Sequence, residues 1–262
     1  MPEGDTVWRA ARALDRALSG RVLTRTDVRV PAYATWDLAG AHVVETVSRG
    51  KHLLTRIDGE QRWTLHTHLK MEGGWRVLRP GQRWPRPAHT ARVVLETADA
   101  VAVGFALGIV EFVARDDEDS IVGHLGPDLL GPDWDADEAV ARLQEHPDRA
   151  IKEALLDQTR LAGIGNMYAS ELCFISGVAP QTRVGDVADL SRIMARAHQL
   201  LDQNRHRAVQ STTGDLSRGR NLWVYGRGGR PCRRCGTRIV ETETGDEGRR
   251  RVTYQCPSCQ PA

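Results

Sequence analysis

The sequence lacks any run of about 18 apolar residues, the length a helix needs to cross a bilayer, which excludes a membrane span. It also lacks a signal peptide, because its opening residues carry acids where such a leader is basic, and they contain no apolar block. Cysteine is scarce, with five in 262 residues, too few for a disulfide-stapled framework. We therefore expect an intracellular, cytoplasmic protein.

The chain has no large excess of either charge, since its net charge is only +2. The acidic and basic residues are, however, unevenly distributed along it. Residues 111–138 hold ten acids against one arginine, whereas residues 218–251 hold ten arginines against four acids. A basic C-terminal part indicates either a polyanionic partner or a solvated basic surface. With 40% apolar and 27% charged residues the composition is globular, and the length, about 1.7 typical domains, predicts two domains.

Periodicity divides the chain into a β-rich and a helical part. Apolar residues at helical spacing predict a first helix over residues 5–19, with Asp5 as its cap and Gly20 at its end. Short β-branched segments from about residue 43 to 113 predict a mainly antiparallel β domain. An acidic run with glycine and proline (116–135) is expected to be a linker. Helices are then predicted at 136–146, 150–158, 166–176 and 187–204.

The last part of the chain carries a metal-ligand pattern. Cys232 and Cys235 are followed, after twenty intervening residues, by Cys256 and Cys259. Two such pairs can close a tetrahedron of thiolates around one zinc ion, which would be structural because no position remains for water. Two local disulfides are the alternative, and the expected intracellular location disfavours them. Cys173 lies in an apolar helical segment and is expected to be buried.

The N-terminus offers a second kind of chemistry. Removal of Met1 would expose Pro2, whose free amine would have an ordinary pKa near about 8, so that a fraction is neutral at pH 7. A secondary amine that condenses with an aldehyde forms a cationic iminium, which is an electron sink for eliminations. Glu3 follows directly and could act as an acid or base. A disordered chain end is the alternative for this short motif.

Four motifs together resemble the formamidopyrimidine-DNA glycosylase/endonuclease VIII family of DNA repair enzymes, in the expected order over the whole chain. They are MPEGDTVWRAA at the start, SRGKHLL around Lys51, LLDQTRLAGIGNMYASELCF at 155–174 and RVTYQCPSCQ at the end. The resemblance implies an α+β multidomain fold. An N-terminal helix and antiparallel β-sandwich (1–118) would be followed by a linker (119–135), a helix–two-turns–helix domain (136–222) and a four-cysteine zinc finger (223–262).

The same resemblance implies roles for single residues. Pro2 would attack C1′ of a damaged nucleoside, Glu3 would assist loss of the base, and Lys51 in its Gly-Lys turn would contact a phosphate during elimination. A solvated surface lysine is the alternative for Lys51. Asn166 follows LAGIG and is expected to cap a helix whose N-terminal N–H groups bind a phosphate. Plain capping without a ligand is the alternative for Asn166.

Arg251 matches the arginine of the family's finger that binds the phosphates flanking an extruded nucleotide, with Arg249 and Arg250 as competing candidates. Met71 falls at the position that fills the gap left by that nucleotide, where a core methionine is the alternative. Lys70 matches a DNA-contacting position in endonuclease VIII-like members.

The sequence departs from the family at three places. Thr6 stands where the family has glutamate, residues 108–112 (GIVEF) lack the arginine of the purine-directed branch, and His124 replaces a linker arginine. The missing arginine in residues 108–112 favours the endonuclease VIII side, which prefers oxidised pyrimidines.

The expected function is therefore that of a monomeric bifunctional DNA glycosylase and AP lyase in base excision repair. It would act on damaged double-stranded DNA near the nucleoid, with single-stranded or forked DNA left open. An AP lyase with weak glycosylase activity and a non-catalytic zinc-ribbon DNA-binding protein are the alternatives.

Overall fold

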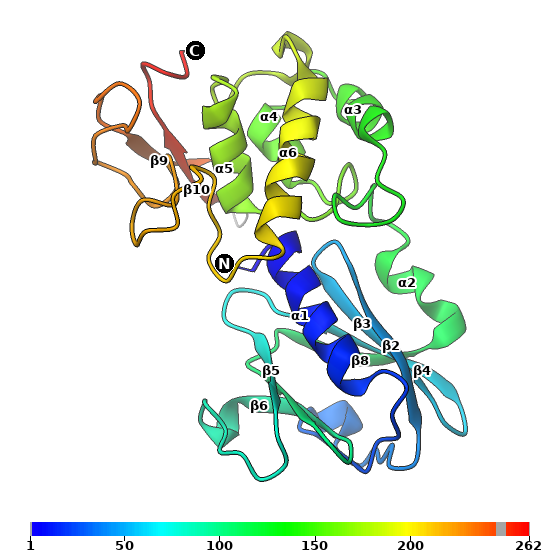
Figure 1. Cartoon of the computed structure of the whole chain (residues 1–262). Helices are drawn as coiled ribbons and strands as arrows, with labels where there is room; N and C mark the ends of the chain where they lie inside the picture. The colour runs from blue at the N-terminus through cyan, green and yellow to red at the C-terminus, as the bar shows by residue number, and fades with distance from the viewer. Residues whose placement is uncertain (1, 245–249, 262) are drawn as a thin grey trace. The chain divides into compact units, whose positions relative to one another are not determined.

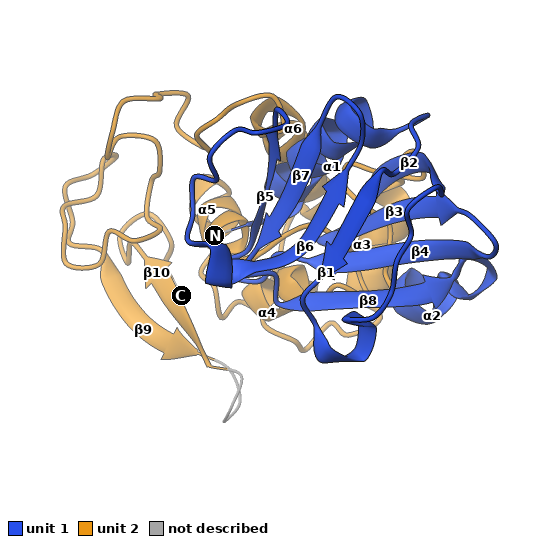
Figure 2. Cartoon of the chain, turned by 90° about the horizontal axis from the view of Figure 1, so that it is seen from below, with its two compact units in different colours: residues 1–124 blue, residues 125–262 orange. Residues whose placement is uncertain are grey.

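The computed structural model describes residues 2–244 and 250–261, which fall into two compact units, 1–124 and 125–262 (Figure 2). The division lies within the segment 119–135 that the sequence predicts to be a linker. The limits of the four predicted domains remain predictions. No helix in the described part of the chain is both long and apolar enough to cross a membrane.

The first unit combines one long helix, α1, with two antiparallel four-stranded sheets (Figure 1). One sheet has the strand order β1-β6-β7-β5 and the other β2-β3-β4-β8. The elements are α1 (Gly4–Leu18), β1 (Arg25–Val28), β2 (His42–Arg49), β3 (His52–Asp58), β4 (Arg62–His68), β5 (Gly74–Leu78), β6 (Ala91–Glu96), β7 (Val101–Phe105), β8 (Ile109–Ala114) and the short helix α2 (Asp119–Val122). Short 3-10 helices span Pro31–Tyr33, Ala88–Thr90 and Arg115–Asp117.

The two sheets and α1 share one apolar core, so the predicted β-sandwich with an N-terminal helix is confirmed. Helical spacing places an apolar stripe of α1 in this core, and the strands contribute alternate residues from both sheets. The buried residues of the stripe are Val7, Ala11, Leu14 and Leu18; the strands add, among others, Leu53, Ile57, Leu65, Val93, Leu95 and Ala102.

The start of α1 differs from the prediction, because Glu3 and not Asp5 occupies the cap position. Glu3 has an extended backbone, and its carbonyl oxygen accepts hydrogen bonds from the N–H groups of Thr6 (2.9 Å) and Val7 (3.0 Å). The helix therefore begins one residue before Asp5, which lies buried in the first turn. The predicted end is confirmed, since the chain leaves the helix at Gly20 with a φ of +74°.

The face of the β2-β3-β4-β8 sheet that points away from this core carries mostly polar side chains, with the buried Leu54 among them. On it, Arg56 on β3 donates to both carboxylate oxygens of Glu118, at 2.9 and 2.8 Å, and to Glu45 on β2 at 2.6 Å. Thr64 on β4 also donates to Glu118. These contacts attach the chain segment that follows β8 to the sheet.

The second unit consists of helices and a C-terminal hairpin, and the four predicted helices are confirmed, with each end at its predicted limit or up to three residues inside it. Its elements are α3 (Ala136–Gln144), α4 (Ile151–Leu156), α5 (Asn166–Ile175), a 3-10 turn (Val184–Asp186), α6 (Leu190–Asn204), β9 (Val240–Thr244) and β10 (Arg251–Gln255). Residues 166–174 of α5 are all buried, so this helix is the centre of the unit. The C-terminal part buries only a small separate cluster of Phe174, Val224, Cys232, Ile239 and Cys256.

The Arg56–Glu118 pair predicts a pH-dependent stability. Burial would raise the pKa of Glu118, but the hydrogen bonds from Arg56 and Thr64 outweigh it and hold the pKa below its ordinary value of 4.5. A depressed carboxyl pKa adds stability above that value, and the contribution is lost as pH falls through the folded-state pKa. We expect Glu118→Gln to lower the free energy of unfolding by about 1.5–3 kcal/mol at pH 7.

Urea unfolding of both proteins from about pH 7 to about pH 3 checks this, and the difference between them should shrink below about pH 4.5. Glu45→Gln is the matched control, because Glu45 is more exposed and its pair should contribute about 0–1 kcal/mol. A loss in Glu118→Gln that does not change with pH would contradict the electrostatic explanation.

Candidate functional site

The predicted site residues divide between the two units. Pro2, Glu3, Lys51, Lys70 and Met71 lie in the first unit. Asn166, Arg251 and the four cysteines lie in the second. Each group is described within its own unit.

The two N-terminal candidates sit at the start of a firmly packed helix. Pro2 is partly exposed, whereas Glu3 is completely buried at the cap position of α1. The helix packs against β2 and β3, the two strands that flank Lys51. The Glu3 carboxyl group is thus shielded from water at the start of a helix that the sheet holds in place.

Lys51 occupies the predicted turn. Arg49 on β2 pairs with His52 on β3, which leaves Gly50 and Lys51 as a two-residue connection. Gly50 has a φ of +57°, which glycine adopts without a steric penalty. The tight turn therefore presents Lys51 at the end of two paired strands.

The loop after β4 presents the other two candidates of the first unit. Met71 has 65% of its surface exposed, so the alternative of a core methionine is wrong. Lys70 has a φ of +51°, an uncommon conformation for a residue with a side chain, and its N–H donates to His68 Nδ1 at 2.9 Å. A Cβ on Gly108 would overlap the Lys70 side chain at 2.1 Å, so only glycine leaves room for it there. The loop is thus held in one shape while its apolar tip faces water.

Lys51 and Lys70 both act electrostatically on His68. Burial lowers the pKa of His68 to about 4, and the charges of Lys70 and Lys51 contribute to this shift. The ring is therefore neutral at pH 7, and with Nδ1 accepting from Lys70 its proton lies on Nε2. Two lysines beside a neutral ring donor form a surface that suits an anion.

Asn166 does not cap its helix as predicted. Gly165 is the N-cap of α5, with an extended backbone and no side-chain cap, and Asn166 is the first helical residue. Its Nδ2 instead donates to the carbonyl oxygen of Val252 on β10 at 2.9 Å, while its buried Oδ1 has no partner among the described residues. The prediction failed because glycine already satisfies the cap geometry, which frees the amide to reach the C-terminal hairpin.

Arg251 is exposed at the first position of β10, and the two residues that follow it in the strand are hydrogen-bonded to α4. Lys152 on α4, which the sequence analysis missed, is buried and donates through Nζ to Val252 O (3.1 Å) and Thr253 Oγ1 (2.5 Å). Burial lowers the pKa of Lys152 to about 8. Arg250 is also exposed, and Arg249 lies outside the described residues.

The four predicted metal ligands come together. Their Sγ atoms all lie within 4.8 Å of one another, with Cys232–Cys259 at 4.0 Å and Cys235–Cys256 at 3.5 Å. Thiolates around a tetrahedral zinc ion, each at about 2.3 Å, are separated by roughly 3.8 Å, so the four cysteines fit such an ion. In the described part of the chain no other group of three or more His, Cys, Asp or Glu side chains converges in this way.

Cys173 takes no part in this cluster. As predicted it is buried in α5, where burial raises the pKa of its thiol to about 12. It therefore stays a neutral thiol at pH 7.

Glu171 is a second residue whose role the sequence analysis missed, although it lies within the motif at 155–174. It is completely buried, and its carboxylate accepts hydrogen bonds from the backbone N–H groups of Trp223, Val224 and Tyr225, each at 2.8 Å. Thr212 donates to the same carboxylate. One side chain of the central helix thus anchors the chain segment that leads to the cysteines.

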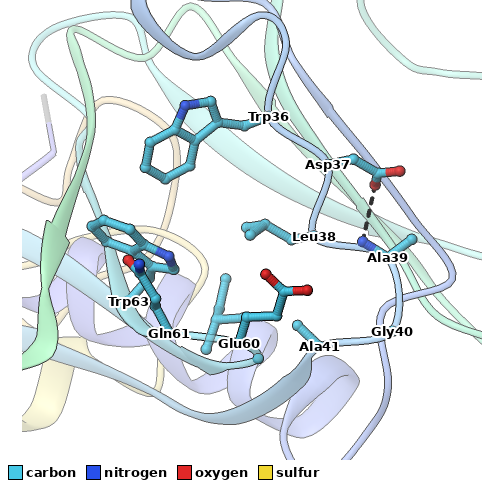
Figure 3. A pocket seen from close by; sticks show the side chains of 11 residues that line it. Trp36, Asp37, Leu38, Ala39, Gly40, Ala41, Glu60, Gln61 and Trp63 are labelled. Carbon is cyan, nitrogen blue, oxygen red and sulfur yellow. Dashed lines mark hydrogen bonds between the residues drawn. The ribbon is translucent and has the colours of Figure 1, made fainter.

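A separate pocket of about 570 Å³ opens at the far end of β3 and β4 (Figure 3). Trp36 and Trp63 form one side of it, with ring centroids 4.9 Å apart, and Glu60 points toward its interior. Lys51 precedes the opposite end of β3, roughly 20 Å away along an extended strand. None of the predicted site residues lines this pocket.

Comparison with known proteins gives matches over the whole chain. The family model of the formamidopyrimidine-DNA glycosylase N-terminal domain matches residues 1–106, and that of the H2TH domain matches residues 125–215. A protein named "Probable endonuclease 8 2" from Streptomyces coelicolor is 56% identical, covering 99% of this chain and 94% of its own. A DNA-(apurinic or apyrimidinic site) lyase from Mycolicibacterium smegmatis is 52% identical, with full coverage of both chains.

More distant proteins share the same architecture. Endonuclease 8 of Escherichia coli is 31% identical over 99% of this chain and 100% of its own. Among solved structures, Lactococcus lactis Fpg in complex with DNA that contains an abasic site superposes with a TM-score of 0.81. It is 23% identical and covers 100% of both chains. This last likeness shows the fold.

The hydrogen bonds of Glu171 predict a large stability effect. Glu171→Ala would leave three backbone N–H groups without their buried acceptor, and each unsatisfied buried donor costs about 1–3 kcal/mol. We expect the free energy of unfolding to fall by at least about 3 kcal/mol, measured by urea denaturation. Glu138→Ala is the control, because this exposed residue makes only an i,i+4 pair with Arg142 and should cost under about 0.5 kcal/mol. A similar small loss in both variants would refute the anchoring role.

Proposed function

Because this chain belongs to the formamidopyrimidine-DNA glycosylase family, we propose that it is a bifunctional DNA glycosylase and AP lyase of base excision repair. Its substrates would be oxidised bases in double-stranded DNA. The observation that carries the proposal is the N-terminus, where Pro2 precedes a buried Glu3 on a helix packed against the strands of the Lys51 turn.

The chemistry begins with the Pro2 amine that removal of Met1 would expose. Its nitrogen attacks C1′ of the damaged nucleoside, the bond from C1′ to the base breaks, and Glu3 acts as the acid or base in base loss and opening of the sugar ring. The resulting iminium withdraws electrons from the sugar, so a proton is lost from C2′ and the 3′ phosphate leaves. A second elimination releases the 5′ phosphate, and water then hydrolyses the remaining iminium, which frees the unsaturated sugar fragment as an aldehyde and regenerates the amine.

Positively charged side chains would hold the phosphates during these steps. Lys51 and Lys70 both act on His68 in the first unit, and a lysine there would offset the charge that develops on a leaving phosphate. Met71 is exposed at the tip of its loop and would enter the gap that an extruded nucleotide leaves in the base stack. In the second unit, Asn166 and Arg251 would contact the backbone on either side of that nucleotide.

Zinc would serve structure only. Four cysteines fit one ion and leave no position for water, and the small apolar cluster around them would not fold a C-terminal finger by itself. The ion would thereby keep β10 and Arg251 in place.

The lesion class and setting follow from the departures noted in the sequence. Without an arginine in residues 108–112, preference for a particular opposite base would be weak, and oxidised pyrimidines are the proposed substrates. We propose a monomer that acts in the cytoplasm at the nucleoid. An AP lyase with weak glycosylase activity is the second candidate, favoured by Thr6 at the position of the family's glutamate.

Blocking the N-terminus tests the proposal. Protein that retains Met1 or an N-terminal tag should lose borohydride trapping on an abasic-site duplex, because its first nitrogen can no longer be the Pro2 amine. Its affinity for a duplex with an uncleavable abasic analogue should remain within a few-fold, since phosphate contacts dominate affinity. Gel analysis of the covalent adduct and fluorescence anisotropy measure the two quantities.

Full trapping by the blocked protein would overturn the role of Pro2. The absence of any adduct from processed protein that still binds DNA would leave only a zinc-containing DNA-binding protein. Excision from duplexes carrying oxidised pyrimidines, oxidised purines or a preformed abasic site separates the two enzymatic candidates. Cleavage of the abasic duplex alone would favour the lyase.

A further inference from the structure

Histidines gather on the polar face of the β2-β3-β4-β8 sheet, next to the Lys51 turn. The strand register places His52 on β3 opposite His68 on β4, and His66 on β4 opposite Glu111 on β8. Because residues two apart in a strand share a face, all four side chains lie on the same side of the sheet. His52 follows Lys51 directly in the chain.

Three of these side chains form a continuous hydrogen-bonded chain. Glu111 Oε1 lies 2.7 Å from His66 Nδ1, and His66 Nε2 lies 2.8 Å from His52 Nδ1. The His52 and His66 rings are nearly parallel, with an angle of 21° between their planes. His66 is almost completely buried, so its ring orientation is fixed.

The hydrogen bonds decide where the protons lie. An ionised carboxylate only accepts, so His66 donates from Nδ1 to Glu111 and carries a lone pair on Nε2. His52 must then donate from Nδ1 to His66, which leaves the lone pair of His52 on Nε2. The hydrogen-bonded chain thus ends, beside the Lys51 turn, in a nitrogen that can take up one proton.

The groups around His52 favour a neutral ring in the free protein. Four groups act electrostatically on its ring: His66, His68, His124 and Lys70. Lys51 precedes it in the sequence, and Arg49 on β2 is its partner in the strand register. Burial, followed by the effects of His66, His68, His124 and Lys70, lowers the pKa of His52 to about 3. Glu111 is the one acid in the hydrogen-bonded chain. Its carboxylate raises the pKa of His66, but burial has the larger effect, so the pKa of His66 is lowered overall.

The negative charge of a bound phosphate would act against the neighbouring positive charges and would favour a protonated His52. We propose that His52 is a further phosphate-binding residue of the Lys51 turn, which gains a proton from solvent at Nε2 when DNA binds, with His66 and Glu111 as positioning residues. The positive charge is then shared along the hydrogen-bonded chain toward Glu111, and no other bond is formed or broken. This inference rests on the proposed function, since its ligand is a DNA phosphate.

Binding of an uncleavable abasic-analogue duplex at several pH values tests the inference without requiring catalysis. The complex holds one more proton than the free protein, so affinity should rise as pH falls from about 8 to about 5.5, by at most about tenfold per pH unit. In Glu111→Gln the amide oxygen still accepts from His66, but the countercharge is gone. The pH profile should therefore move to lower pH by about 1 unit or more.

Glu45→Gln is the matched control. Glu45 lies on the same face of the same sheet, its side chain is as exposed as that of Glu111 (42% each), and it pairs with Arg56 instead of histidine. Its variant should keep the wild-type profile. Equal profiles for Glu111→Gln and wild type, or a wild-type affinity that does not change over this range, would overturn the inference and leave the proposed function intact.

Imidazole nitrogen NMR of the DNA-free protein separates this inference from the proposed function. Neutral His66 and His52 should both carry their proton on Nδ1, and Glu111→Gln should shift the His66 proton resonance. The opposite tautomer at either ring would overturn the hydrogen-bonded chain. If no form of the protein binds the abasic-analogue duplex, both the proposed function and the phosphate role of His52 fail.

Discussion

The packing of α1 against two sheets is the constraint on which the candidate chemistry depends. A chain end is ordinarily mobile, and a mobile amine cannot be aimed at one carbon atom. Here the apolar stripe of α1 is buried in the sandwich core, and the helix begins at a completely buried Glu3. Pro2 is therefore one residue from a fixed point, and strands that pack on the same helix present Lys51. Hydrophobic burial in this way supplies the orientation that catalysis by a terminal amine requires.

The C-terminal part of the second unit is held in another way, because it has little apolar surface to bury. Polar groups of the helices replace hydrophobic contacts there. Glu171 accepts hydrogen bonds from three backbone N–H groups of the segment before the cysteines. Lys152 and Asn166 both donate to the carbonyl oxygen of Val252. These contacts surround the strand that begins at Arg251. Buried charges are costly unless they are fully hydrogen-bonded, and their use here gives the hairpin a defined position on α4 and α5.

Sequence patterns predicted those features that depend on local spacing. Helical periodicity located the helices, the paired cysteines located a cluster that closes to within 4.8 Å, and the Gly-Lys pair located the turn of Lys51. Two caps were predicted wrongly, at Asp5 and Asn166, because a neighbouring residue already had the extended backbone that a cap needs. The resemblance added roles for single residues, which geometry alone would not assign.

Other features could not be found in the sequence because they depend on which strands are neighbours. The hydrogen-bonded chain from Glu111 through His66 to His52 joins three strands, and its register follows only from the folded sheet. The sequence did not single out Lys152, which packing buries against β10. Glu171 lies within the motif at 155–174, but the hydrogen bonds of its carboxylate to the backbone of a distant segment follow only from the fold.

The central claim is that the nitrogen of Pro2 forms the covalent intermediate. Borohydride reduction on an abasic-site duplex, followed by digestion and tandem mass spectrometry of the conjugate, locates the bond directly. The account predicts that the DNA-derived fragment is attached to the Pro2 nitrogen in the N-terminal peptide. A fragment attached to the side-chain amine of Lys51 or Lys152 would contradict it.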